Sequence, residues 1–288
     1  MGKIKTLNIE GIKAYIEHKA GALRRPFGKY LAKQEARLIK KLARKFKQQL
    51  RWILAEAKQL DFFGEKKGLV ILDKKTYYDE IDKLVDGIPY NTEIVDNIVA
   101  TAKPVYKKGV AKGIEELELG RYGVTFDLVN DQAVEYLEKL KTLQLSNFKG
   151  SISRTTKDKI RRILVESAET GRSYTETSKL IQAQGDEGVF SRARGELIAV
   201  NQIGRAYGQG NYDIVDAFRK DTNSIIQKYW QTVEDDQVTE ECAANQDQGW
   251  IGYDEAFPSG DEQAPRESNP RCRCVTAYRT VDKQGNPD

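Results

Sequence analysis

The 288-residue sequence has few of the side chains on which most catalytic and metal sites depend, with one histidine and three cysteines. The single histidine, His18, is isolated near the N-terminus, so we expect no Ser-His-Asp or Cys-His arrangement. Gly204, Gly208 and Gly210 lie inside or at the end of an expected helix, at the wrong spacing for a phosphate-binding loop. The sequence therefore predicts a protein that is not an enzyme.

Long apolar runs are also missing. No stretch approaches the roughly 20 apolar residues that a membrane-spanning helix needs, so we expect no contact with a membrane. The first residues lack the apolar core of a secretory signal. Three cysteines without such a signal favour a reducing compartment and argue against a disulfide scaffold.

The charge is distributed unevenly along the chain. The formal net charge is +4, yet residues 1–60 hold 16 lysines and arginines against four acidic residues. Residues 231–270 show the opposite bias, with eleven acidic residues and one arginine. The basic segment 1–60 and the acidic segment 231–270 suggest that the two bind different partners. The alternative is that these charges form solvated surfaces that aid solubility.

Residues 28–60 read as one long amphipathic helix with an apolar stripe at 3.6-residue spacing. We expect Leu42, Phe46, Leu50 and Ile53 in this stripe to anchor a partner, which is either internal or another chain. The basic residues on and before this helix are candidates for partner or DNA binding, because phosphate contacts are electrostatic and independent of sequence. They are Arg24, Arg25, Lys33, Arg37, Lys40, Lys41, Arg44, Lys45 and Lys47.

The rest of the chain alternates helical and extended patterns. We expect a helix from about residue 92 to 117, which Pro104 kinks or splits and whose end Gly109, Gly113 and Gly120 weaken. Further helices are expected over 130–140, 155–169, 173–181 and 191–218. Strands are expected at 225–233 and 272–278, with a loop at 243–270. The predicted fold is α+β and mainly helical, with a basic helical region at 1–120 and a second domain at 121–288.

The stretch from Phe126 to the end resembles the phage Mu protein F-like family of minor head, or head morphogenesis, proteins. The resemblance depends on four ordered pieces, none specific alone. They are the segment 126–130 with its helix, the helix–Gly171–Ser173 turn–helix unit, the segment 196–202, and the closing series of Tyr229-Trp230, Asp235-Asp236, Cys242 and residues 270–274. The resemblance implies helices packed on a small antiparallel sheet.

The sequence departs from the family pattern where that pattern is polar. Thr239 stands where a cysteine is usual, Asn269 replaces a histidine, and Val200 and Gln202 replace an arginine and a glutamate. The resemblance thus implies a retained fold with a weakened polar site.

The resemblance also implies a role, partners and a location. The protein would be a minor capsid protein that acts in procapsid assembly and docks to the portal protein and other head proteins. It would contact packaged double-stranded DNA nonspecifically inside the capsid near the portal, after assembly in the host cytoplasm. The alternatives are a DNA-binding ejection accessory and a toxin-like effector enzyme, either a nuclease or an ADP-ribosyltransferase. Only 14 residues follow Cys274, so we expect no passenger domain.

The three cysteines, Cys242, Cys272 and Cys274, leave three interpretations open. A structural zinc site usually takes four nitrogen or sulfur ligands, for which Asp236 could be the fourth. The residues could instead be small packing side chains, or two of them could form a disulfide. Because the spacing of Cys272 and Cys274 is not the usual Cys-x-x-Cys, packing is favoured and we expect no cofactor and no stoichiometric zinc.

Overall fold

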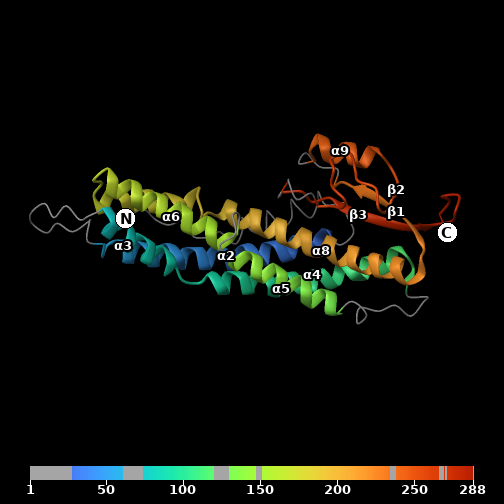
Figure 1. The fold of residues 1–288 in the computed structure, drawn as a ribbon, viewed down its shortest axis with the longest axis horizontal. Coiled ribbons are helices and arrows are strands. Elements are labelled where there is room, and N and C mark those ends of the chain that lie inside the picture. Colours follow the sequence, from blue (N-terminus) through green and yellow to red (C-terminus); the bar gives the residue numbers. More distant parts are fainter. Residues whose placement is uncertain are drawn as a thin grey trace, which may run out of the picture. The chain divides into compact units, whose positions relative to one another are not determined.

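A computed structural model describes residues 28–60, 74–119, 130–146, 151–233, 238–265, 269 and 271–287. It is mainly helical with one small antiparallel sheet, which confirms the predicted fold class (Figure 1). The helices are α2 (Gly28–Ala57), α3 (Lys74–Asp86), α4 (Asn91–Glu116), α5 (Asn130–Leu145), α6 (Ile152–Glu169), α7 (Tyr174–Asp186), α8 (Arg192–Thr222) and α9 (Glu240–Asp247). The strands are β1 (Ile225–Gln231), β2 (Ile251–Gly252) and β3 (Val275–Val281).

The residues group into two compact units. The first unit comprises Met1–Leu38, Ile98–Glu138 and Glu196–Asp288, and the second comprises Ile39–Asn97 and Lys139–Gly195. The sheet lies in the first unit, whereas α3, α6 and α7 lie in the second.

The first unit depends on a very close contact between α4 and α8. A methyl group added at Gly109 would collide with the backbone oxygen of Tyr207, and one added at Gly210 would collide with that of Tyr106. Each helix therefore uses a glycine where the backbone of the other passes. The expected helix is found as α4, which runs continuously past Pro104 and ends at Glu116, and the structure adds that Gly109 and Gly113 permit the contact with α8.

The sheet has the strand order β2-β1-β3, and β1 pairs along all seven of its residues with β3. Alternate side chains of β1 are buried, so Ile226, Lys228 and Trp230 face inward, as the pleat requires. In Figure 1, α9 lies beside the sheet. The buried faces contribute to one apolar cluster around Tyr278 and another around Trp230.

Side chains from α4 and α8 cover the outer edge of β3. The Asn211 amide donates a hydrogen bond of 3.0 Å to the carbonyl oxygen of Thr276, and the Glu116 carboxylate accepts one from the backbone of Tyr278. Lys112 forms an ion pair of 3.4 Å with Glu116. An open strand edge is a template for unwanted pairing, so these contacts protect β3 as well as fixing it to the helices.

In the second unit, α6 packs against α3 and α7. Ion pairs join α6 to α3, with Arg161 Nε lying 2.6 Å and Lys157 Nζ lying 2.9 Å from their aspartate partners, Asp82 and Asp86. The turn between α6 and α7 matches the expectation, because Gly171 has a φ of 64° and Ser173 forms a capping box with Glu176.

The structure adds one helix and corrects one expectation. Residues 74–86 form α3, a segment for which no element was predicted. The expected loop at 243–270 contains most of α9 and all of β2. Thr239 explains α9, because its hydroxyl caps the helix by accepting from the Cys242 backbone. A cap followed by only two turns leaves little periodicity for a sequence pattern to detect.

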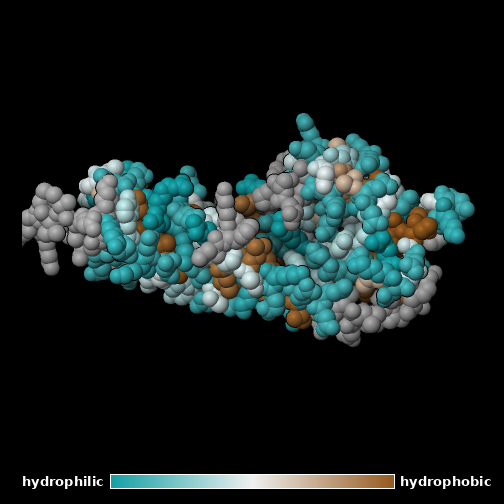
Figure 2. All heavy atoms as spheres, in the orientation of Figure 1, coloured by the Kyte–Doolittle hydropathy of each residue, from teal (hydrophilic) through white to brown (hydrophobic). Residues whose placement is uncertain are grey.

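Hydrophilic residues predominate on the described part of the face shown in Figure 2, where hydrophobic residues form small separate groups. Among the described residues, no helix combines the length and apolar character that crossing a bilayer demands.

Candidate functional site

The basic residues predicted on α2 occupy the side of the helix that faces solvent. Lys33, Arg37, Lys40 and Arg44 are exposed, and Lys41, Lys45 and Lys47 are partly exposed. Arg24 and Arg25 lie outside the described residues. The sequence prediction missed Arg51, which is also exposed and follows Lys47 by one helical turn. A search for cations at spacings of three and four residues would have found it.

The apolar side of the same helix packs inside the protein. Leu42, Phe46 and Ile53 are fully buried, and Leu50 is partly buried. Phe46 packs edge-to-face against Phe190, with ring centroids 6.3 Å apart. Of the two alternatives left open by the sequence, an internal partner or another chain, the structure shows the internal one, since the apolar stripe packs within this chain.

We define the cationic face as Lys40, Arg44, Lys47 and Arg51 of α2. Their spacing of four, three and four residues aligns them along one side of the helix. No acidic side chain among the described residues forms an ion pair with any of them. Lys45 differs, because its ammonium group lies 4.6 Å from the centre of the Tyr90 ring. The cationic face is thus available for anions, whereas Lys45 is engaged internally.

The structure brings the three cysteines together. Cys242 is in the first turn of α9, and Cys272 and Cys274 come directly before β3. The three Sγ atoms lie within 4.8 Å of one another, and those of Cys242 and Cys272 are 3.8 Å apart. All three side chains are buried and none forms a disulfide.

The surroundings of this thiol group are apolar. Trp230, Ile251, Phe257 and Ala264 pack around the three cysteines. The adjacent thiols and burial raise the pKa of Cys274 far above its ordinary value. This shift favours the neutral form of the Cys274 thiol.

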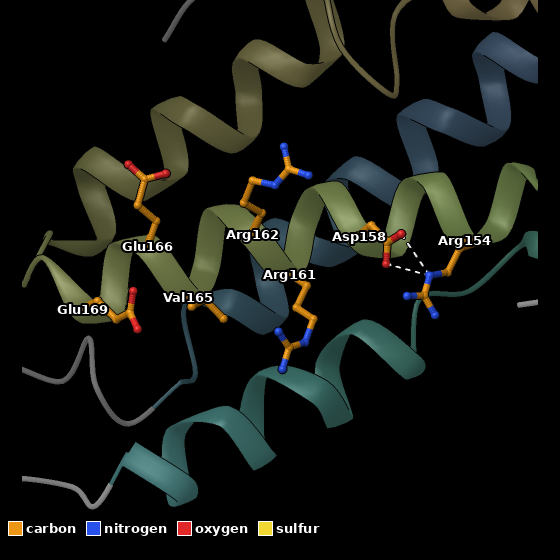
Figure 3. A pocket seen from close by; sticks show the side chains of 7 residues that line it. All are labelled: Arg154, Asp158, Arg161, Arg162, Val165, Glu166 and Glu169. Atoms are coloured by element: carbon orange, nitrogen blue, oxygen red, sulfur yellow. Dashed lines mark hydrogen bonds and ion pairs between the residues drawn. The ribbon is translucent and has the colours of Figure 1, made fainter. Parts of the chain in front are cut away.

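The exposed side of α6 is hollowed but offers no unused charge cluster (Figure 3). Arg154 pairs with Asp158 at 2.8 Å, and Glu166 pairs with Arg172 at 2.8 Å. Arg161 points toward α3, where it binds Asp82. These local pairs satisfy most of the charges and Arg162 is exposed, so this surface has the character of a solvated helix face.

A second hollow lies in the first unit, between Tyr136, Arg205 and Gln209 on one side and residues 260–265 on the other. Beneath it, Asp213 accepts hydrogen bonds from Tyr106 and from Gln209, the latter at 2.7 Å. Burial raises the pKa of Asp213, although these two hydrogen bonds oppose the rise. The bonds join α4 to α8, which is a sufficient structural role for the carboxylate.

The family model described as Phage Mu protein F like protein matches residues 158–277 of the chain. This confirms the Mu F-like resemblance. No curated protein and no solved structure matches the chain. The matched residues include the thiol group, β1 and α9, whereas α2 and its cationic face precede them.

The Mu F-like match supports a bacteriophage protein of head morphogenesis, with other head proteins as partners and the virion as its location. It supports neither the ejection accessory nor the effector enzyme. The match begins at residue 158 and therefore carries no information about α2.

Proposed function

We propose that the protein is a phage minor head protein that works by docking to the portal and contacting packaged DNA through α2, without catalysing a reaction. The supporting observation is the arrangement of side chains around this helix. Its apolar side is buried within the chain, whereas Lys40, Arg44, Lys47 and Arg51 face solvent without acidic partners among the described residues.

Four cations aligned on a helix, without acidic partners among the described residues, present a row of positive charge that attracts anions of another molecule. Duplex DNA carries one negative charge for about every 1.7 Å of its axis, and its phosphates attract such a row whatever the base sequence. Acidic side chains on the surface of the portal protein would attract the same row of cations. Since the apolar side of α2 is occupied, both contacts would be predominantly electrostatic and therefore weaken steeply with salt.

The test is a fourfold charge reversal, with Lys40, Arg44, Lys47 and Arg51 each changed to Glu. We expect DNA affinity, measured by gel shift at about 50 mM salt, to fall by more than about tenfold. The dependence of log affinity on log salt should become shallower by about 0.9 for each phosphate that the variant no longer neutralises. Co-purification with the portal protein of the same phage should disappear in parallel.

A charge-matched control is available. Arg162, Lys179, Arg271 and Lys283 are also exposed, and reversing them changes the net charge by the same amount. We expect this control to bind DNA and the portal nearly as well as the original protein. Equal losses in both variants would show that net charge matters and the cationic face does not. Unchanged binding in the α2 variant, with native circular dichroism, would refute the proposal.

The absence of catalysis is tested separately. We expect no turnover of nucleotides, NAD or nucleic acids by the purified protein. Turnover that disappears on replacing one polar side chain, such as Arg205 or Asp213 near the hollow of the first unit, would establish an enzyme and overturn this part of the proposal.

A further inference from the structure

The thiol group of Cys242, Cys272 and Cys274 has the sulfur spacing that a single metal ion would need. Two thiolates bound to one tetrahedral Zn²⁺ at about 2.3 Å lie about 3.8 Å apart. The Sγ atoms of Cys242 and Cys272 are 3.8 Å apart, and Cys274 Sγ lies within 4.8 Å of both. Small adjustments of one side chain would place all three sulfurs around a single ion.

The backbone holds these side chains in place. Thr239 caps α9 through a 3.4 Å hydrogen bond from the Cys242 amide. The backbone amide of Cys272 donates to the Asn269 carbonyl at 2.9 Å, and β3 begins at Val275 in full register with β1. Residues 272–274 are not part of a strand. The side chains of Cys272 and Cys274 are therefore not held at the fixed spacing of alternate strand residues and can approach one another. The site is thus fixed from two distant parts of the sequence.

We propose that the three cysteines bind one thiophilic metal ion, Zn²⁺ or Cu⁺, which joins α9 to the segment before β3. Thiolate sulfur is the ligand that both ions prefer. No histidine, aspartate, glutamate or further cysteine joins the group among the described residues. Cu⁺ accepts three thiolates alone, whereas Zn²⁺ would require a fourth donor, and Asp236, the candidate from the sequence, lies outside the described residues.

The sequence favoured packing, because the spacing of Cys272 and Cys274 is not Cys-x-x-Cys. It offered all three cysteines as candidate ligands but could not show that their sulfurs meet, and the structure places the three Sγ atoms within 4.8 Å of one another. Packing alone would be satisfied by alanine or valine at each position, because the surrounding side chains are apolar. A metal site demands sulfur at all three.

The decisive measurement is elemental analysis of the full chain, purified without chelators under reducing conditions. We expect about one Zn or Cu per chain, and the element found identifies the ion. Metal-free protein titrated with Co²⁺ without oxygen should develop the intense near-ultraviolet band of cobalt–thiolate bonds. Each of the variants Cys242→Ser, Cys272→Ser and Cys274→Ser should lose most of the bound metal and this band.

A conservative change in the same cluster separates metal loss from unfolding. Ile251→Val removes one methylene beside the cysteines but no ligand, so it should retain the metal. Removing the metal should lower the melting temperature of the original protein and leave that of folded Cys272→Ser unchanged. Folded original protein that carries no metal and develops no cobalt–thiolate band would overturn the proposal, as would serine variants that retain the metal.

Discussion

Two helix contacts in this protein, one in each unit, are built on opposite principles. In the first unit, α4 and α8 approach so closely that glycine is required on both helices, and their polar side chains are buried. In the second unit, α3 and α6 are joined by ion pairs whose side chains are only partly buried. The first contact therefore depends on backbone shape, whereas charge contributes only slightly to the second.

The largest effect should come from Gly210→Ala. The added methyl group would collide with the backbone oxygen of Tyr106, which cannot move without displacing α4. We expect a loss of unfolding free energy of about 3 kcal/mol or more, measured by urea unfolding, even though alanine is intrinsically the better helix former.

Gly204→Ala is the matched control on the same helix. Its new methyl group would meet a side-chain carbon of Pro265 at 3.5 Å, which is ordinary van der Waals contact. This variant should be neutral or more stable by up to about 1 kcal/mol. Equal effects of the two substitutions would show that close approach does not govern the α4–α8 contact.

A smaller effect is expected from Asn211→Ala, which uncovers the edge of β3. The Thr276 carbonyl would lose its 3.0 Å hydrogen bond in a buried setting, at a cost of about 1–3 kcal/mol. Urea unfolding measures the loss. Relative to the original protein, the variant should show a larger increase in amide hydrogen exchange in β3 than in α6. Gln284→Ala, an exposed polar deletion on the tail, should change neither quantity.

Glu116 makes the same network sensitive to pH. Burial raises its pKa above the ordinary value, more than Lys112 and the hydrogen bonds lower it. The folded protein therefore binds this proton more tightly than the unfolded chain does. The resulting stabilisation is complete below the pKa that Glu116 has in the unfolded chain. It is lost as pH rises through the higher pKa that Glu116 has in the folded protein. Relative to Glu116→Gln, the original protein should gain stability as pH falls toward 4.5; an unchanged difference would contradict the burial argument.

The smallest effect should come from Arg161→Met in the second unit. Its ion pair with Asp82 has both side chains nearly half exposed, so water and salt screen it. We expect a loss below about 1 kcal/mol that disappears in about 1 M salt. The neighbouring Arg162→Met removes an exposed arginine with no such pair among the described residues and is the control. A large, salt-independent loss for Arg161 alone would erase the contrast between the two contacts.

Local patterns in the amino-acid sequence were enough to predict several elements of this fold. Periodicity located α2 and α8, and the Ser173–Glu176 capping box and Gly171 fixed the turn after α6. Alternation predicted β1, and the ordered pieces of the C-terminal half identified the Mu F-like region. These signals are readable because each arises from residues within a few positions of one another.

Features that join distant residues emerged only in the folded chain. There, Gly109 and Gly210 serve a helix contact, Phe46 is buried internally rather than offered to a partner, and three sulfurs converge. In sequence, a glycine that weakens a helix cannot be distinguished from one that admits a neighbouring backbone. The reason is physical, because close approach and burial depend on which segment packs against the residue, and that segment can lie a hundred positions away.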